Sequence, residues 1–254
     1  MMSRTFLSYE KPLLTCMVQA ETPDRIKELI ARSLPEGAEA FGMQFCRLKP
    51  EFRTSEIYRE LFNRPDGLPT YVTNYRHFVN SAKSDEMLAQ ELLELAECGA
   101  TLCDVMGDYF DRTKGELTVN AEAVSKQMKL IDDLHERGAE VLMSSHVSRF
   151  IPAEQVLEIA FEHQRRGADI CKIVTGASDM AEQIENLRIV NLLKQELKIP
   201  FLFLAGGECR ILRRVGGTLG NCMSLCVCEY DKLATREQPL LHDLKQLRDL
   251  LEVK

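Results

Sequence analysis

The chain has 254 residues, of which 45% are hydrophobic and 28% are charged, and its formal net charge is −7. This length lies within the range of one α/β barrel, and the composition is that of a soluble globular protein. The excess of acidic residues argues against a nucleic-acid-binding protein, although a local arginine can still bind an anionic substrate.

The amino-terminal region and the cysteines indicate the compartment. Ser8, Glu10 and Lys11 interrupt the first apolar residues, and no later run is long and apolar enough to span a bilayer. The nine cysteines are an odd number, and several sit in apolar, strand-like runs. This pattern is typical of reduced core thiols. We therefore expect a cytoplasmic protein that does not associate with membranes.

Short apolar runs alternate with longer amphipathic runs along the whole chain. The runs expected to form strands are Leu13–Ala20, Ala40–Leu48, Thr70–Arg76, Thr101–Gly107, Glu140–His146, Asp169–Thr175, Pro200–Gly206 and Cys222–Glu229. The helical patterns that follow them are Pro23–Leu34, Ser55–Phe62, Asp85–Cys98, Ala121–Arg137, Ala153–Arg166, Met180–Leu197, Cys209–Val215 and Leu240–Leu251.

A repeated pattern separates helices from the strands that follow them. In "HERGAEV" Arg137 lies in the last helical turn and Gly138 ends the helix, and "ECGATLCDV" and "RRGADICKI" repeat this order. Strict alternation of strand and helix indicates a parallel sheet, and eight such units close into a (β/α)8 barrel. We expect a single domain over residues 1–254. An open doubly wound sheet is the alternative, but no G-x-G-x-x-G follows the first strand.

Two residues on neighbouring predicted strands could carry chemistry. His146 ends the fifth strand, "EVLMSSH", and Lys172 lies in the sixth, "DICKIVT". Active sites of such barrels lie at the carboxyl ends of the strands. A lysine desolvated there has a lowered pKa and can attack a carbonyl to form an iminium, while a histidine can move protons. A lysine in a strand is also often ion-paired, and a strand-end histidine is often structural. The position of His146 and Lys172 on neighbouring predicted strands favours a catalytic role for both.

At these residues the sequence resembles the type I 3-dehydroquinate dehydratases, which are (β/α)8 barrels. "GADICKI" is similar to the family's lysine segment, which implies the Schiff-base role for Lys172. "VLMSSHVSRFIP" is similar to its histidine segment, which implies the proton-transfer role for His146. "RRVGGTLGNCMSL" resembles the segment with the carboxylate-binding arginine, which implies that role for Arg213. "ATREQPLL" resembles a late substrate-binding loop, which implies Thr235 and Gln238 as binding residues.

The sequence departs from the family at the second and third strands. Gln44 stands where the family has the glutamate of Glu-x-Arg, and Arg76 comes one residue later than the arginine of Thr-Phe-Arg. The resemblance implies a substrate-binding role for both residues. A shift of one residue turns a strand side chain to the opposite face. The glutamate expected near the histidine has Glu86 as its counterpart, at altered spacing. Asp104 and Asp108 are further candidates to orient His146 or to bind substrate hydroxyls.

The resemblance implies a dehydratase that converts 3-dehydroquinate, or a similar cyclic hydroxy-keto acid, into an enone and water. It implies a small-molecule carboxylate substrate, no metal or organic cofactor, and a homodimer. Cys222, Cys226 and Cys228 do not change this, because their spacing lacks the C-x2-C pairs of a zinc ribbon. Two alternatives stay open: a Schiff-base aldolase on a sugar phosphate, with an anion site at Gly206-Gly207, and a catalytically idle, metabolite-binding barrel.

Overall fold

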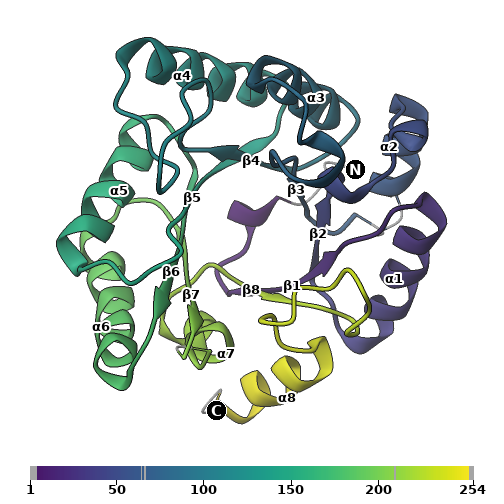
Figure 1. The fold of residues 1–254 in the computed structure, drawn as a ribbon. Coiled ribbons are helices and arrows are strands. Elements are labelled where there is room, and N and C mark those ends of the chain that lie inside the picture. Colours follow the sequence, from purple (N-terminus) through teal and green to yellow (C-terminus); the bar gives the residue numbers. More distant parts are fainter. Residues whose placement is uncertain (1–4, 64, 66, 209, 252–254) are drawn as a thin grey trace.

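Eight parallel strands form one sheet in the computed structural model, which describes residues 5–63, 65, 67–208 and 210–251 (Figure 1). The strands are β1 (Leu13–Val18), β2 (Ala40–Gln44), β3 (Thr70–Thr73), β4 (Leu102–Met106), β5 (Glu140–His146), β6 (Ile170–Ala177), β7 (Phe201–Gly207) and β8 (Met223–Cys226). Consecutive strands pair from β1 through β7, and β8 pairs with β1. The predicted barrel is confirmed.

The helices form an outer ring around the sheet, as Figure 1 shows. They are α1 (Pro23–Glu36), α2 (Ser55–Asn63), α3 (Asp85–Glu97), α4 (Ala121–Glu136), α5 (Ala153–Arg165), α6 (Met180–Glu196), α7 (Leu212–Leu219) and α8 (Leu241–Leu251). Thr22, Ser84, Asn120 and Asp179 cap helix amino termini by accepting backbone N–H bonds. Gly138 and Gly167, which follow α4 and α5, have φ of 79° and 95°, so the predicted helix stop is confirmed there.

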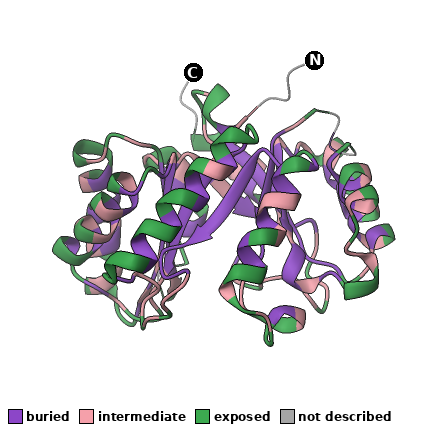
Figure 2. Ribbon diagram, turned by 90° about the horizontal axis from the view of Figure 1, so that it is seen from above, coloured by how far each residue is buried: buried purple, intermediate pink, exposed green. Residues whose placement is uncertain are grey.

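Apolar side chains fill two separate layers. One set points into the barrel and closes its lower part, which is the end where the strands begin. This set includes Leu13, Leu102, Leu142, Ile170 and Leu202. The other set packs between the sheet and the helices, so the strands are almost continuously buried while each helix keeps an exposed face (Figure 2). This is the pattern of a parallel sheet covered on both sides. Inside the barrel, the polar cluster around Lys172 lies on the carboxyl-end side of this apolar layer.

Several predicted element boundaries were wrong at the mouth of the barrel. β2 ends at Gln44 rather than Leu48, because Phe45–Arg47 forms a 3-10 turn in which Phe45 and Cys46 are both buried. β3 ends at Thr73 and β8 at Cys226, each before the predicted end. α7 spans Leu212–Leu219 instead of Cys209–Val215, and Cys209 lies outside the described residues.

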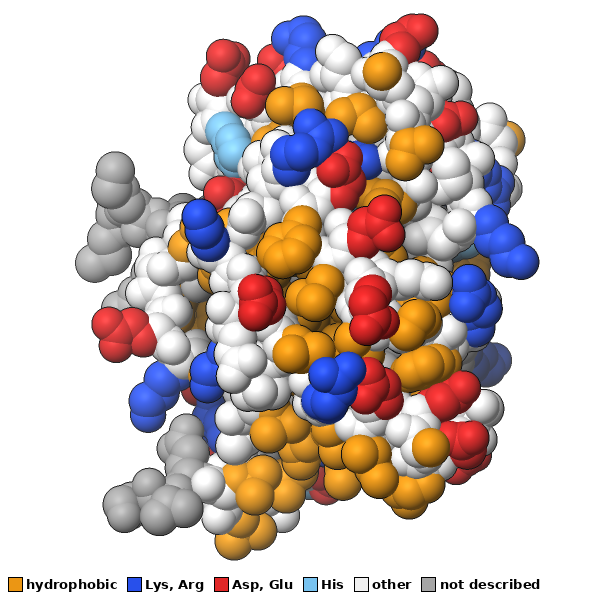
Figure 3. Space-filling model, turned by 90° about the vertical axis from the view of Figure 1, so that its left-hand side faces the viewer, with side chains coloured by type: hydrophobic (Ala, Val, Ile, Leu, Met, Phe, Trp, Pro, Cys, Tyr) orange, Lys and Arg blue, Asp and Glu red, His pale blue; other side chains and the backbone are white. Residues whose placement is uncertain are grey.

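The outer surface carries isolated apolar side chains among charged ones. Phe161 on α5 and Met180 and Ile184 on α6 are exposed, and Figure 3 shows apolar side chains interspersed with acidic and basic groups on this face. Among the described helices, none has the length and apolarity that a bilayer crossing requires.

The gap between β7 and β8 is bridged by a backbone hydrogen bond and by the side chain of Asn221. The backbone N–H of Cys222 donates to the carbonyl of Phe201 at 2.9 Å. Above it, the Asn221 amide takes the place of a strand: its Oδ1 accepts from the N–H of Phe203 at 2.9 Å and its Nδ2 donates to the Phe203 carbonyl at 3.0 Å. Gly216 makes room for it, because a Cβ there would lie 2.4 Å from Asn221 Nδ2.

We predict that Asn221→Ala lowers the free energy of unfolding by about 2–4 kcal/mol, because it leaves the buried N–H and C=O of Phe203 without partners. Urea unfolding measures this loss. Asn120→Ala, which removes only a helix cap, serves as the control and should cost about 1 kcal/mol. Equal losses in the two variants would contradict the closing role of Asn221.

Candidate active site

Lys172 lies at the centre of a buried polar cluster inside the barrel. Its Nζ is 3.1 Å from Asp104 Oδ2, 3.0 Å from the Tyr71 hydroxyl and 2.6 Å from the Tyr75 hydroxyl. Strands β3, β4 and β6 bring these residues together from sequence positions up to 101 residues apart. The lysine is thus ion-paired, rather than the isolated desolvated amine expected from the sequence.

Asp104 is the anion of this cluster. Both tyrosine hydroxyls donate to its Oδ2, and the Ser144 hydroxyl donates to Oδ1. Burial by itself raises the pKa of Asp104, but the Lys172 charge and these three hydrogen bonds outweigh it and hold the pKa below its ordinary value. The prediction that Asp104 orients His146 was therefore wrong; it neutralises the lysine instead.

The two tyrosines are proton donors in this arrangement. Burial raises the pKa of the Tyr71 and Tyr75 hydroxyls well above the ordinary value, and the neighbouring Asp104 charge raises both further. They differ in access: Tyr71 is fully buried below the lysine, whereas Tyr75 is half-buried at the mouth. The ring of Tyr75 also meets the ring of His146 edge-on, with centroids 5.3 Å apart.

His146 lies one inward-facing position above Lys172. In the β5–β6 register Ser144 pairs with Lys172 and His146 with Val174. The His146 Nδ1 is 2.6 Å from Glu116 Oε2, and this carboxylate also accepts from the His146 backbone N–H at 3.2 Å. Burial raises the pKa of Glu116, but hydrogen bonding to His146 and its charge lower it more, so the net shift is downward. Glu116 therefore stays ionised at neutral pH and fixes the ring.

The loop that carries Glu116 is held by buried groups. Ser145 Oγ donates to the Glu116 carbonyl at 2.7 Å. Arg166, whose side chain is 0% exposed, donates to the carbonyls of Gly107 and Thr118 at the two ends of this loop. Glu116 itself has a φ of 55°, which is uncommon for a residue other than glycine. The surrounding bonds therefore impose the conformation that aims Glu116 at His146.

Glu86 and Asp108, the other acids considered as groups that orient His146, lie in other surroundings. Glu86 is exposed on α3, and Asp108 bonds to Arg76 Nη1 at 2.6 Å. Arg76 also binds Asp85 through Nε and Nη2, at 2.6 and 2.7 Å. The guanidinium of Arg76 is held by these two carboxylates, and its role in substrate binding stays a prediction. Tyr75 occupies the inward position one residue earlier. Gln44 is half-buried at the end of β2.

Arg213 is buried beside a carboxylate of its own chain. Its Nε donates to the Ala205 carbonyl at 3.1 Å, and its Nη2 is 3.1 Å from Glu237 Oε2. Glu237 belongs to the β8–α8 loop, and its side chain is 42% exposed. The same loop holds Thr235, which accepts from Gln19 Nε2 at 2.8 Å, and Gln238, whose backbone N–H donates to the Thr235 carbonyl. Thr235, Gln238 and Arg213 therefore lie on one side of the mouth.

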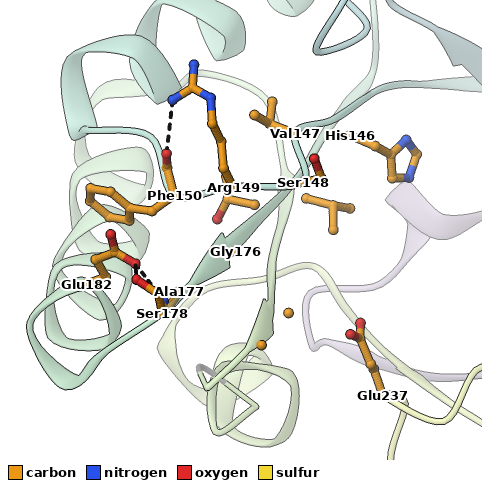
Figure 4. A pocket seen from close by; sticks show the side chains of 14 residues that line it. His146, Val147, Ser148, Arg149, Phe150, Gly176, Ala177, Ser178, Glu182 and Glu237 are labelled. Atoms are coloured by element: carbon orange, nitrogen blue, oxygen red, sulfur yellow. Dashed lines mark hydrogen bonds between the residues drawn. The ribbon is translucent and has the colours of Figure 1, made fainter.

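A cavity of about 700 Å³ opens at the carboxyl ends of β5, β6 and β7. Figure 4 shows His146 and Glu237 at the inner part of this cavity, whereas Arg149 turns to the Phe150 carbonyl and Glu182 to Ser178. Glu237, and not Arg213, lines the cavity. Lys172 is also outside this lining, and Glu237 connects the cavity to Arg213.

Sequence reasoning missed three residues of this site, for different reasons. Tyr71 and Tyr75 share the inward parity of β3 and its extension, so their polar hydroxyls on a core-facing side could have been recognised. Glu116 lies in an irregular loop after β4, where no periodicity indicates which way a side chain points.

The comparisons with known proteins agree with the barrel fold. The family model for type I 3-dehydroquinase matches residues 67–254. No curated protein sequence matches the chain significantly.

Three solved structures share the fold over nearly the whole chain. A 3-dehydroquinate dehydratase from Geobacillus kaustophilus HTA426 has 15% identity and a TM-score of 0.82, over 96% of this chain and 93% of that one. A type I enzyme from Clostridium difficile, described with covalently modified comenic acid, has 15% identity, a TM-score of 0.79 and the same coverages. The enzyme from Enterococcus faecalis has 18% identity and a TM-score of 0.77, over 96% and 95%. With the family match, the chain belongs to the type I 3-dehydroquinase family.

Proposed function

We propose that this protein is a Schiff-base-forming dehydratase that converts 3-dehydroquinate, or a closely similar cyclic hydroxy-keto acid, into an enone and water. One observation carries the proposal: Lys172 and His146 lie on adjacent strands at the mouth of the barrel, and His146 is hydrogen-bonded to a carboxylate. The family match supports a hydro-lyase. A homodimer and a cytoplasmic location stay predictions.

In the proposed mechanism Lys172 supplies the electron sink. Its amine adds to the substrate ketone and, after loss of water, forms an iminium that acidifies the neighbouring C–H bond. His146 removes that proton and then returns it to the departing β-hydroxyl, which leaves as water. Glu116 keeps the ring in place and stabilises the imidazolium between the two transfers. Hydrolysis of the iminium releases the enone and restores Lys172.

The substrate carboxylate is assigned to Arg213, whose planar guanidinium can bind it through two hydrogen bonds. To reach Arg213, the ligand displaces the Glu237 carboxylate, which is half-exposed and lies on a loop. Thr235 and Gln238 are then placed to contact the substrate from the same loop. Gln44 is placed to contact it from the opposite side of the mouth, where it ends β2.

One feature counts against each alternative. A sugar-phosphate aldolase needs an anion site at Gly206-Gly207. The side chain that faces this turn is the Glu237 carboxylate, 3.1 Å from a Cβ added to Gly206, and its displacement exposes Arg213, which the proposal assigns to a carboxylate. An idle barrel would have no need of a buried ion pair, which seldom improves stability over apolar packing. The Lys172–Asp104 pair is retained with its hydrogen bonds satisfied, which favours a catalytic role.

We expect borohydride reduction during turnover of 3-dehydroquinate to fix the ligand mass on the peptide that contains Lys172. Lys172→Ala should abolish both the adduct and enone formation, whereas Lys83→Ala, a lysine bound to Glu91 outside the site, should keep both. Peptide mass spectrometry and the absorbance of the enone report the outcome. An adduct on another lysine would refute the assignment.

We predict that Glu116→Gln lowers kcat by about 10- to 100-fold while KM changes little, because Glu116 contacts His146 and does not line the cavity. An amide keeps the shape but cannot stabilise an imidazolium. The pKa of Glu116 is below its ordinary value, so in the wild type this support is present at neutral pH and is lost only as the pH falls through that value. Steady-state kinetics of both proteins test it; unchanged kcat would exclude Glu116.

Glu237→Gln should tighten the binding of carboxylate ligands by about 3- to 10-fold, because it removes the anion that competes for Arg213. Quinate is a suitable probe, since it has the carboxylate but no ketone and cannot form an imine. Calorimetric titration measures its affinity. Glu182→Gln is the matched control, because Glu182 also lines the cavity but bonds to Ser178. Weaker quinate binding in Glu237→Gln alone would overturn the assignment of Arg213.

A further inference from the structure

Imine formation requires two protons to leave the lysine nitrogen and two protons to reach the carbonyl oxygen, which departs as water. In the proposed function His146 is assigned to the carbon next to the imine and to the β-hydroxyl. A proton donor that lies beside Lys172 Nζ is placed to serve the carbonyl oxygen. The described residues within hydrogen-bond distance of this nitrogen are Tyr71, Tyr75 and Asp104.

We propose that Tyr75 is a catalytic acid of this enzyme, which passes protons between Asp104 and the carbonyl oxygen of the substrate during imine formation. The inference rests on the proposed function and adds a role to it. Tyr75 lies 2.6 Å from Nζ and donates to Asp104, so it contacts both the nucleophile and the group that receives the nucleophile's proton.

The proton balance is as follows. The Lys172 ammonium gives a proton to Asp104, and the free amine forms a bond to the ketone carbon. The carbonyl oxygen takes a proton from Tyr75, which is reprotonated by Asp104. The adduct nitrogen then gives a second proton to Asp104. The C–O bond breaks as the oxygen takes its second proton from Tyr75, and Asp104 again restores the phenol. Water leaves and a protonated imine remains on Lys172.

Position distinguishes Tyr75 from Tyr71, which has the same two partners. Tyr71 is fully buried below Nζ, among the apolar side chains that close the lower barrel. Tyr75 is half-buried at the mouth, with its ring against His146. The substrate must lie on the His146 side, because His146 acts on the carbon next to the ketone. Tyr75 can therefore reach the carbonyl oxygen, and Tyr71 cannot.

The high pKa of the Tyr75 hydroxyl agrees with this role, because the group stays protonated and is restored at once by Asp104. The neighbouring charges are arranged for such a transfer. Lys172 and Asp104 form the ion pair that supplies and accepts the proton, while Ser144 holds the other oxygen of Asp104 and Glu116 lies beyond His146.

Exchange of the ketone oxygen with ¹⁸O-labelled water tests the proposal, because each round of imine formation and hydrolysis replaces that oxygen. The His146→Ala background blocks dehydration, so exchange into 3-dehydroquinate reports imine formation alone. We expect Tyr75→Phe to slow exchange by about 10²-fold or more, the usual value of a positioned acid. Tyr71→Phe, the matched control, should slow it by at most about tenfold. Thermal unfolding of both variants checks the fold.

The outcomes separate this inference from the proposed function. Exchange that is unaffected by Tyr75→Phe, or slowed equally by Tyr71→Phe, would overturn the acid role and leave the dehydratase assignment standing. Glyoxylate serves as a second probe, since its imine with Lys172 can be trapped by borohydride without any dehydration. If 3-dehydroquinate fails but glyoxylate is trapped, the same comparison of the two tyrosine variants still decides the role of Tyr75. A wild-type protein that traps neither compound would overturn both proposals.

Discussion

The buried ion pair between Lys172 and Asp104 is the constraint on which the arrangement of side chains at the carboxyl end of the barrel depends. An unpaired ammonium or carboxylate at this depth would cost several kcal/mol, so each charge requires the other and both require hydrogen bonds. Tyr71 in β3, Tyr75 just after β3 and Ser144 in β5 supply those bonds. The lower barrel is apolar, and it sets the depth at which this polar cluster can begin.

A second set of buried polar groups positions His146. Arg166 at the end of α5 bonds to both ends of the loop that follows β4, and this loop carries Glu116 to the histidine. The acid–base group thus depends on a residue outside the mouth. The Thr118 carbonyl accepts from Arg166, and the Gly107 carbonyl accepts from Arg166, from Gln127 and from the Thr118 backbone N–H. The loop therefore has little freedom to move Glu116 away.

Two arginines at the mouth are paired with carboxylates of the same chain. Arg76 is held by Asp85 and Asp108, and the inward position before it is Tyr75. Arg213 is retained, but Glu237 covers it. The cationic character of the pocket is therefore lower than the sequence indicated. Ligand selection depends on whether the β8–α8 loop moves, because Glu237 and the proposed ligand carboxylate compete for the same guanidinium.

The sequence by itself determined the barrel and the adjacency of Lys172 and His146, whose catalytic roles stay a proposal. Alternating apolar runs and helix-ending glycines predicted eight strand–helix units, and strand order alone placed Lys172 and His146 next to each other. Only the tertiary structure decided which groups surround them. Hydrophobic periodicity predicts the face on which a side chain lies, but it does not predict the path of a loop or the choice among several acids. Glu116 rather than Glu86 reaches His146, and Asp104 rather than solvent meets Lys172, because contacts between distant segments fix those positions.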